Sequence, residues 1–362
     1  MQKKILKKYF KGKKVLITGH TGFKGSWLTL WMYFNGAKVL GISNGIPTKP
    51  SHFKLLNLKK LILSKSIDIN DLNKLKKIFF KFNPDYVFHL AAQSIVKVSY
   101  LQPVETWSAN LMGTVNILEC LRLSKKKIIA IMITSDKAYK NIETKKGYNE
   151  NDILKGEDPY GASKSSADIA INSYFKSFFN NKNNKVLIAI ARAGNVIGGG
   201  DWSKNRIVPD CIRSWSKKKK VIIRNPNSTR PWQHVLDIIY AYMNLAVKLK
   251  QNPKLHGEAF NFGPDKKNFK VIDILNKIKL YWPKINWSTV KRKKFKENTL
   301  LHLNSSKSKK FLKWKTVLNF TNSVRFTIEW YKYYLKNKKN IYYYSTKQIA
   351  KYDKILEKKS NN

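Results

Sequence analysis

Short apolar runs alternate with amphipathic stretches through the first two hundred residues. The runs have the length and composition of strands, whereas the amphipathic stretches repeat apolar residues at helical spacing. The pattern predicts strands at 14–19, 37–43, 85–92, 127–135 and 185–198. It predicts helices at 24–35, 70–81, 107–123 and 162–179, each between two of these runs.

The alternation of strands and helices determines the predicted fold class. Strand–helix–strand units join into a parallel sheet through right-handed crossovers. The runs, such as Val15, Leu16 and Ile17, are apolar throughout, as in a sheet that helices cover on both faces. We therefore expect an α/β protein with a Rossmann-type, doubly wound parallel sheet.

The pattern changes after Gly200, where long loops rich in Trp, Arg, Asn and Pro appear. Loops of this kind suit a substrate lid. A helix at 234–249 and a strand at 258–264 follow, and we expect the charged segment from Lys347 to fray. The predicted organisation is a dinucleotide-binding Rossmann domain over 1–192 with a returning segment at about 221–262, a smaller mixed substrate-binding domain over 193–220 and 263–346, and a charged tail over 347–362.

Size and composition restrict the classes of protein that fit. The chain has 362 residues, of which 43% are hydrophobic, so one large domain or two closely packed domains can bury a core. No apolar run reaches the ~20 residues that cross a bilayer, and the first residues lack the features of a signal peptide. Cys120 and Cys211 are the only cysteines, which excludes a disulfide framework and a paired-cysteine metal site and fits a reducing cytoplasm.

The net charge is unusual, because 71 Lys and Arg against 22 Asp and Glu give +49. Such a surplus is typical of proteins that bind nucleic acid or anionic membranes. Here the lysines are spread from Lys3 to Lys359, and no nucleic-acid-binding motif accompanies them. We interpret the charge as a solvated surface and expect neither a nucleic-acid nor a membrane partner. A basic nucleic-acid-binding protein remains the alternative from another functional class.

The segment from Gly19 to Gly25 joins the first predicted strand to the first predicted helix, and its three glycines lie three residues apart. Glycine permits a sharp strand-to-helix turn and lets a diphosphate approach the amides at the start of the helix. The spacing is G-x-x-G-x-x-G rather than the common G-x-G-x-x-G, and an ordinary tight turn is the alternative. Its position between a strand and a helix favours a dinucleotide cradle.

The choice between NAD and NADP stays open at the second predicted strand. An acidic residue at its end would bind the adenosine ribose of NAD, but the chain has Ser43 and Asn44 there. Asp68, after the third apolar stretch, fits either a contact with adenine or an N-cap of the following helix.

Two further segments contain side chains suited to acid–base chemistry. Tyr160 and Lys164 are four residues apart and share a helix face, where an ammonium would lower the pKa of the phenol. Ser135 ends a strand at the edge where ligands bind in open α/β sheets, and Asp136 and Lys137 follow it. These two residues form either a surface ion pair or the acid and base of a second proton transfer.

Together these motifs identify the chain as similar to the extended short-chain dehydrogenases/reductases, the NAD-dependent epimerase/dehydratase family. The glycine and Tyr/Lys motifs specify only that superfamily. The narrower motifs HTGFKGSW, TSDK and RPWQHVL resemble those of CDP-glucose 4,6-dehydratases, and the resemblance extends from about Gly12 to Leu318.

The resemblance implies roles for residues on the cofactor side. It implies NAD as the cofactor and no metal. Catalysis would rest on Ser135, Asp136, Lys137, Tyr160 and Lys164. The residues that would hold the cofactor are Gly19, Thr21, Gly22, Phe23, Gly25, Asp68, Ile69, Ala91, Ala92, Gln93, Tyr160 and Lys164.

On the substrate side, the resemblance implies that Asn195, Arg206, Arg230 and Asp237 bind a nucleotide sugar. Without the resemblance, the two arginines would be interpreted as surface residues of a cationic chain. Asp237 fits either a contact with a ribose hydroxyl or a helix cap.

The implied reaction converts CDP-glucose to CDP-4-keto-6-deoxyglucose and water, by oxidation at C4, elimination across C5 and C6, and hydride return to C6. Tyr160, helped by Ser135, would take the 4-hydroxyl proton. Asp136 would protonate the departing 6-hydroxyl, and Lys137 would take the C5 proton. Many related dehydratases carry glutamate at the position of Lys137, and a lysine acts as a base only if its pKa falls.

The resemblance also implies a biological setting. The product would feed deoxysugar synthesis for a surface polysaccharide of the lipopolysaccharide O-antigen type, in the cytoplasm. A homodimer is expected, with the helix at 107–123 contributing to its interface. The alternative within the superfamily is an epimerase or a dehydratase that acts on a dTDP-, UDP- or GDP-sugar. An epimerase would not need the pair Asp136 and Lys137.

Overall fold

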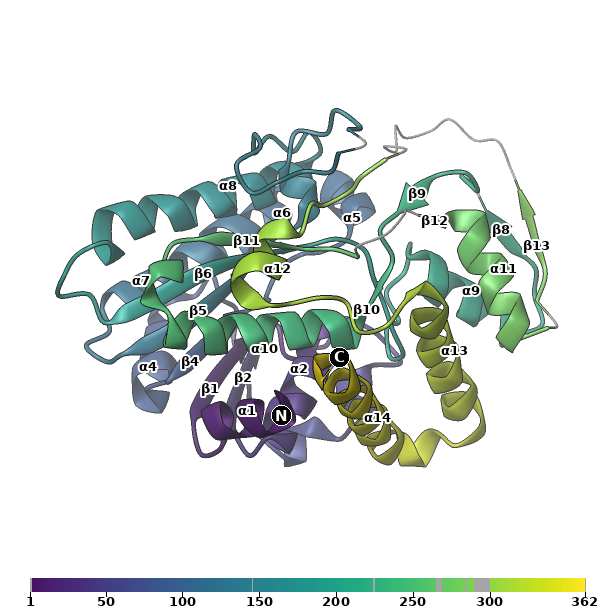
Figure 1. Ribbon diagram of the computed structural model, residues 1–362, viewed down its shortest axis with the longest axis horizontal. Coiled ribbons are helices and arrows are strands. Elements are labelled where there is room, and N and C mark those ends of the chain that lie inside the picture. The colour runs from purple at the N-terminus through teal and green to yellow at the C-terminus, as the bar shows by residue number, and fades with distance from the viewer. Residues whose placement is uncertain are drawn as a thin grey trace.

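The computed structural model describes residues 2–144, 146–223, 225–264, 269–283, 285–289 and 300–361. At its centre is a seven-stranded sheet in which all neighbouring strands are parallel (Figure 1). From one edge to the other, the strands are β11 (Ala259–Phe262), β6 (Val186–Ala193), β5 (Ile128–Ile133), β4 (Tyr86–His89), β1 (Lys14–Thr18), β2 (Lys38–Ser43) and β3 (Leu63–Ser66). The chain runs outward from β1 to β3 and then returns to β4, which confirms the predicted doubly wound sheet.

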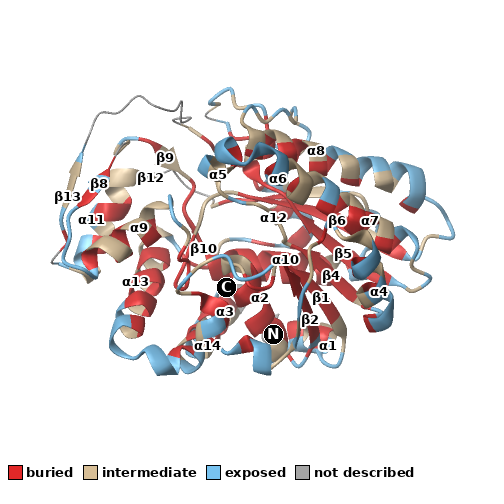
Figure 2. Ribbon diagram, turned by 180° about the vertical axis from the view of Figure 1, so that it is seen from behind, coloured by how far each residue is buried: buried red, intermediate tan, exposed pale blue. Residues whose placement is uncertain are grey.

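Alternate residues of the central strands pack on opposite faces of the sheet. Val15 and Ile17 of β1 belong to one hydrophobic core, whereas Leu16 belongs to another. The first core includes residues of α1 (Gln2–Phe10), α2 (Phe23–Phe34) and α10 (Val235–Gln251), together with helices of the later part of the chain, and the second includes residues of α4 (Leu72–Phe82), α7 (Gly113–Arg122) and α8 (Pro159–Tyr174). Figure 2 shows the sheet buried between these layers. Burial on both faces explains why the strand sequences are apolar throughout.

Short helices and turns join the longer elements. The short helices are α3 (His52–Leu55), α5 (Val96–Leu101) and α6 (Pro103–Trp107). Single 3-10 turns occupy Leu58–Lys60, Asp136–Ala138, Pro253–Leu255 and Lys338–Asn340, and π-helical turns occupy Ser108–Met112 and Phe175–Phe179.

A mixed region lies beside the sheet, to its right in Figure 1. Its helices are α9 (Ile207–Trp215), α11 (Val271–Tyr281) and α13 (Phe320–Lys336), while α12 (Ser306–Leu312) packs near β11. Its strands form three pairs: β7 (Val196–Ile197) with β10 (Gln233–His234), β8 (Val221–Ile223) with β13 (Trp287–Thr289), and β9 (Thr229–Arg230) with β12 (Phe269–Lys270). The boundaries proposed for the two domains stay a prediction.

The start of α8 differs from the sequence-based expectation. The helix begins at Pro159 rather than at residue 162, because the Asp158 side chain accepts a hydrogen bond from the Gly161 N–H at 2.9 Å and caps it. Tyr160 therefore lies in the first turn of the helix.

The prediction of a frayed tail is wrong. The chain ends in α14 (Ile341–Asn361), which packs against α1, α2 and α13. Ile349 and Tyr352 are fully buried, and Leu356 is nearly so. These apolar residues recur at intervals of three and four and so form a stripe on one face of the helix. The stripe can be buried although charged residues lie between its members in the sequence.

The described helices include none whose length and apolar character would suit a bilayer crossing. In the same part of the chain, no three His, Cys, Asp or Glu side chains are grouped so that they could hold a metal ion. Cys120 and Cys211 are both buried free thiols.

Candidate active site

The carboxyl ends of the central strands open onto one large cavity, whose volume is about 1610 Å³. Gly19, Ala91 and Asn195 line it just after β1, β4 and β6, and Ser43 and Ser135 line it at the ends of β2 and β5. The cavity continues from this edge to the loops of the mixed region. It therefore lies where open α/β sheets bind their ligands.

The cavity brings together every predicted site residue except Asp237. The residues that line it are Gly19, Thr21, Gly22, Phe23, Gly25, Asp68, Ile69, Ala91, Ala92, Gln93, Ser135, Asp136, Lys137, Tyr160, Lys164, Asn195, Arg206 and Arg230.

The glycine turn closes tightly against its surroundings. Gly19 has φ +76°, and a Cβ there would lie 2.7 Å from the backbone nitrogen of Ala91. A Cβ on Gly25 would lie 2.0 Å from the carbonyl oxygen of Gly19. Gly22 is the N-cap residue of α2, so the free amides of the first helical turn face the cavity. Such a turn can hold a diphosphate on its amides.

Asp68 lines the cavity beyond the glycine cradle. Its carboxylate accepts hydrogen bonds from the Asn44 side chain and the Asn70 N–H, both at 2.9 Å. Asp71, not Asp68, caps α4 by accepting from the Lys74 N–H at 3.0 Å. The cap interpretation of Asp68 is therefore wrong, and its carboxylate lies in the cavity wall.

A π-helical turn orients Gln93. The helix predicted over 107–123 is interrupted at Ser108–Met112, where Asn110 turns inward. The Asn110 side chain accepts from the Gln93 N–H at 2.8 Å and donates to the Gln93 carbonyl at 3.1 Å and to Ser163 Oγ at 2.9 Å. The turn thus joins the loop after β4 to α8, in keeping with the frequency of π turns at functional sites.

Tyr160 and Lys164 lie on successive turns of α8, with 9% and 5% of their surfaces exposed. Burial raises the pKa of Tyr160 to about 12, while a hydrogen bond with Ser135 and the charge of Arg206 lower it. Burial and the nearby Lys24 lower the pKa of Lys164 to about 7. The charge of Arg206 lowers the pKa of Tyr160 here, and the effect of Lys164 on this phenol stays a prediction.

Asp136 lies in the cavity wall beside this pair and is 4% exposed. Its Oδ1 accepts from the Ser135 hydroxyl at 3.0 Å, and its Oδ2 has no hydrogen-bond partner within the described ranges. Burial raises the pKa of the carboxyl, although Lys137, Ser135 and Lys24 oppose the shift. A buried carboxyl of this kind can keep a proton and deliver it to a leaving group.

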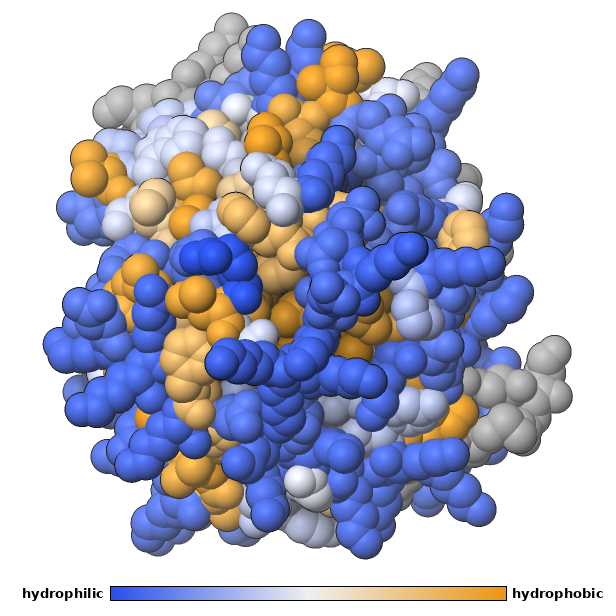
Figure 3. All heavy atoms as spheres, turned by 90° about the vertical axis from the view of Figure 1, so that its left-hand side faces the viewer, coloured by the Kyte–Doolittle hydropathy of each residue, from blue (hydrophilic) through white to orange (hydrophobic). Residues whose placement is uncertain are grey.

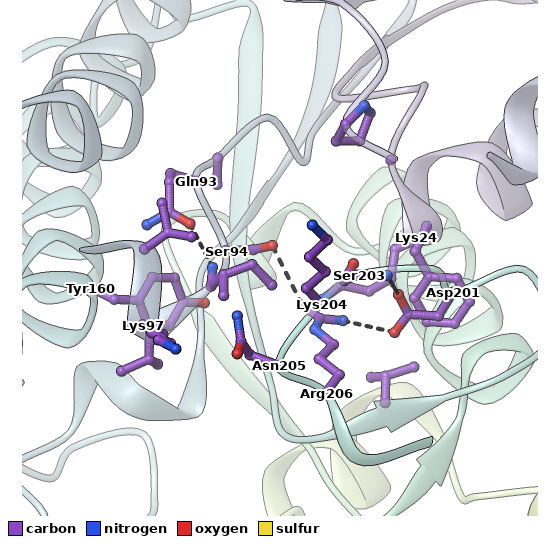
Figure 4. A pocket seen from close by; sticks show the side chains of 18 of the residues that line it. Lys24, Gln93, Ser94, Lys97, Tyr160, Asp201, Ser203, Lys204, Asn205 and Arg206 are labelled. Atoms are coloured by element: carbon purple, nitrogen blue, oxygen red, sulfur yellow. Dashed lines mark hydrogen bonds and ion pairs between the residues drawn. The ribbon is translucent and has the colours of Figure 1, made fainter. Parts of the chain in front are cut away.

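Two arginines reach the cavity from outside the sheet. Arg206 precedes α9, and Arg230 ends β9. One nitrogen of Arg206 donates to Asp201 Oδ2 at 3.2 Å and another to Ser94 Oγ at 3.4 Å (Figure 4). This guanidinium therefore links the mixed region to the loop after β4. Forked guanidinium groups of this kind suit a diphosphate.

The prediction that Asp237 binds substrate is wrong. The residue is fully buried and does not line the cavity. Its Oδ1 accepts from the Val317 N–H at 2.7 Å and from the Tyr352 hydroxyl at 2.9 Å. His234, not Asp237, is the N-cap residue of α10. Asp237 thus ties α10 to the C-terminal part of the chain.

Sequence reasoning missed Lys24. This residue lies in the first turn of α2 and lines the cavity beside Asp201 (Figure 4). Burial and the charge of Arg206 lower the pKa of Lys24 to about 8, although Asp136 and Asp201 oppose the shift. The sequence feature that could have identified Lys24 is its position as a charged residue between Gly22 and Gly25 of the cradle.

Comparison of sequences shows that the chain is similar to nucleotide-sugar 4,6-dehydratases. The chain matches a family model described as GDP-mannose 4,6 dehydratase over residues 16–327. It is 41% identical over 337 residues to a CDP-glucose 4,6-dehydratase of Salmonella typhimurium, an alignment that covers 92% of this chain and 94% of that protein.

Solved structures resemble the fold. An epimerase of Methanothermobacter thermautotrophicus superposes with a TM-score of 0.79 at 23% identity, covering 93% of this chain and 96% of that one. A dTDP-glucose 4,6-dehydratase of Bacillus anthracis, solved in complex with NAD, superposes with a TM-score of 0.73 at 19% identity, covering 90% and 97%.

Proposed function

Since the chain belongs to the GDP-mannose 4,6-dehydratase family of the extended short-chain dehydrogenases/reductases, we propose that it converts CDP-glucose to CDP-4-keto-6-deoxyglucose and water. The choice of CDP-glucose rests on the relative from Salmonella typhimurium, which carries that name and aligns over nearly the whole chain. The observation that carries the choice of reaction is the buried, partly unpartnered carboxyl of Asp136 beside Tyr160 in one cavity.

NAD is the proposed cofactor, and the cavity fits it. The backbone approaches so closely at Gly19 and Gly25 that no Cβ could be placed there, as a diphosphate cradle requires. Asp68 and Ile69 would hold the adenine end, and Gln93, Tyr160 and the residues near them the nicotinamide end. When bound, NAD accepts a hydride from the sugar and later returns it.

The first proton transfer is assigned to Tyr160. Its phenol oxygen takes the proton of the sugar 4-hydroxyl, and Ser135, which hydrogen-bonds to it, orients the same hydroxyl. The pKa of Tyr160 must fall from about 12 for this step. Arg206 already acts in that direction, and closing the cavity around the sugar strengthens its effect by excluding water.

The elimination of water is assigned to Asp136 and Lys137. Asp136 holds its proton because burial raises its pKa, and it delivers that proton to the departing 6-hydroxyl. Lys137 follows directly in the cavity wall and takes the proton from C5. A 4-epimerase would need no such pair, so this arrangement favours a dehydratase.

Substrate recognition is assigned to the mixed region. Arg206 and Arg230 would hold the diphosphate of the nucleotide sugar, and Asn195 would contact it from the end of β6. Arg206 would then exchange at least one of its present partners, Asp201 and Ser94, for phosphate oxygens.

The function is tested by incubating the purified protein with CDP-, dTDP-, UDP- and GDP-glucose without added cofactor. The expected result is a 4-ketosugar, seen by its absorbance in alkali, from CDP-glucose alone. Equal conversion of another nucleotide sugar, or formation of an epimer in place of the ketosugar, would contradict the proposal.

We also propose a homodimer. Several large apolar side chains on and near the α7–α8 side are exposed, among them Met112 at 49% and Ile169 at 55%. Figure 3 shows hydrophobic patches between hydrophilic side chains on one face of the molecule. Sedimentation of the wild type and of Ile169→Glu tests the dimer, since a charge at a buried interface would shift the equilibrium to monomer.

The proposed setting is the cytoplasm, where the two free thiols would stay reduced. There the product would enter deoxysugar synthesis for a polysaccharide of the lipopolysaccharide O-antigen type.

A further inference from the structure

A buried ion pair lies close to the cavity without lining it. Arg192 of β6 and Asp168 of α8 have side chains that are 4% and 2% exposed. Two hydrogen bonds join them, from Nε to Oδ2 at 2.9 Å and from Nη2 to Oδ1 at 2.7 Å. Neither residue lines the cavity, so neither has an assigned part in binding or chemistry. Burying two charges is costly unless their remaining polar atoms are satisfied, so the further partners of the pair matter.

One partner is the Glu150 carbonyl, which accepts from Arg192 Nη1 at 3.0 Å, and two others lie at the two ends of the segment 134–139. At its start, the Thr134 hydroxyl donates to Asp168 Oδ2 at 2.9 Å. At its end, Arg192 Nη1 donates to the Tyr139 hydroxyl at 2.6 Å, and the guanidinium lies 5.0 Å from the centre of the Tyr139 ring. The three acid–base residues of this segment lie between the two anchors.

The same pair is fixed to the helix that carries the other two acid–base residues. Asp168 follows Lys164 by four residues and Tyr160 by eight, so the three side chains share one face of α8. A second contact holds the helix and the segment in register, because the Ser165 hydroxyl donates to the Ala138 carbonyl at 2.7 Å.

We propose that Asp168 and Arg192 are positioning residues for the reaction, and that their ion pair sets the placement of Ser135–Asp136–Lys137 relative to Tyr160 and Lys164. The inference rests on the proposed function. Proton transfers at C4 and at C5–C6 of one bound sugar require both groups to be held within about 0.5 Å of their productive positions. One ion pair that anchors both ends of the segment to the helix supplies that restraint.

The charge of Asp168 has a separate effect on Lys164. The carboxylate raises the pKa of Lys164, against burial and Lys24, which lower it. His89 of β4, on which the charge of Lys164 also acts, stays neutral because burial lowers its pKa to about 3. Removing the carboxylate of Asp168 therefore lowers the pKa of Lys164 further.

Asp168→Asn keeps the shape of the side chain and removes its charge. We expect kcat to fall roughly 10- to 100-fold, because small displacements of reacting groups cost about this much. The KM for CDP-glucose and the content of bound NAD should stay at wild-type values. Because the pKa of Lys164 is about 7, the pH–kcat profile near pH 7 should shift to lower pH in the variant, a change that loss of stability alone would not cause.

If Asp168→Asn does not fold, two variants with a smaller structural change test the same proposal. Thr134→Val and Tyr139→Phe each remove one hydroxyl that holds one end of the segment, and each should lower kcat roughly fivefold. The control is Arg122→Gln, which breaks a similarly forked pair with Glu119, at 2.9 and 2.8 Å, away from the cavity. Its kcat should equal that of the wild type.

Wild-type kcat and an unshifted pH profile in folded Asp168→Asn would overturn the proposal, as would wild-type kcat in both milder variants. A lower melting temperature with unchanged kinetics would assign the pair to stability alone and would also overturn it. A wild-type protein inactive on every nucleotide sugar would instead contradict the proposed function, so the two failures are distinguishable.

Discussion

The cofactor side and the substrate side of the cavity are built in different ways. On the cofactor side, side chains follow directly from parallel strands or lie on long helices, as Gly19 does after β1 and Lys164 does on α8. On the substrate side, Arg206 and Arg230 stand on loops and on strand pairs of two or three residues. Residues on the cofactor side are therefore held in place by the rigid sheet. The positions of residues on the substrate side depend on contacts between distant segments.

The difference indicates how such a protein divides its tasks. The groups proposed to transfer protons need fixed geometry, and elements of the sheet provide it. The groups proposed to recognise the nucleotide sugar lie on loops, which can change without disturbing the framework. Substitutions on the two sides should therefore impair different properties of the protein. The following predictions run from the largest expected effect on activity to the smallest.

Gly19→Ala should abolish activity by displacing the cradle. Gly19 has φ +76°, and the new Cβ would lie 2.7 Å from the backbone of Ala91. We expect NAD binding to weaken at least roughly 100-fold, since displacements of about 1 Å cost this much. The matched control is Gly12→Ala, where φ is +73° but nothing lies within 4 Å of the new Cβ. Equal NAD content in both variants would show that positive φ, rather than close approach, decides the effect.

Asp136→Asn should slow water loss by a factor of roughly 10²–10⁴, the usual contribution of a general acid. Oxidation at C4 should persist, because Tyr160 and Lys164 remain. In the wild type, burial raises the pKa of Asp136, so water loss should decline as pH rises and the acid gives up its proton. That decline should be absent from the variant. Rapid-quench analysis of the sugar over a pH series measures both, and unaffected water loss would contradict the assignment.

Arg206→Met should raise the KM for CDP-glucose roughly tenfold with little change in bound NAD, because a forked, charged contact with phosphate is lost. It should also lower kcat, because the charge that lowers the pKa of Tyr160 is removed. The comparison between the two sides predicts this separation of effects. Arg325→Met, at an arginine that does not line the cavity, is the control and should leave KM unchanged. If Arg206→Met lost NAD instead, the guanidinium would belong to the cofactor side.

Asp237→Asn should leave activity unchanged and alter stability. Burial raises the pKa of Asp237 to about 7, above its unfolded value of about 3.9. The associated stability is thus fully present below about pH 3.9 and is lost as pH rises through about 7. The wild type should lose roughly 1–3 kcal/mol more than the variant in free energy of unfolding between pH 5 and pH 8. Urea titrations at both pH values measure this difference. A raised KM for CDP-glucose in the variant would contradict the prediction and indicate that Asp237 contributes to substrate binding.

The fold and the cofactor side could be predicted because their signals are local. Continuous apolar runs identify strands buried on both faces, and a glycine turn after the first strand fixes the edge where ligands bind. The spacing of Tyr160 and Lys164 is likewise readable once a helix is predicted there. These features depend on residues near one another in the chain.

The remaining features depend on distant segments. Asp237 is buried because Val317 and Tyr352, 80 and 115 residues further along, close over it. Arg206 contacts Ser94 across 112 residues. The charges of Arg206 and Asp201, which act on the pKa of Lys24, likewise lie far along the chain. No pattern within one segment reports such contacts.

In the proposed reaction, one cavity takes a hydrogen from C4 of the sugar and places it on C6 of the same molecule. The most direct test converts CDP-glucose that carries deuterium at C4 and locates the label in the product by NMR. We expect deuterium in the C6 methyl group, with no net consumption of NAD. Deuterium lost to water, or retained at C4 of an epimerised sugar, would contradict it.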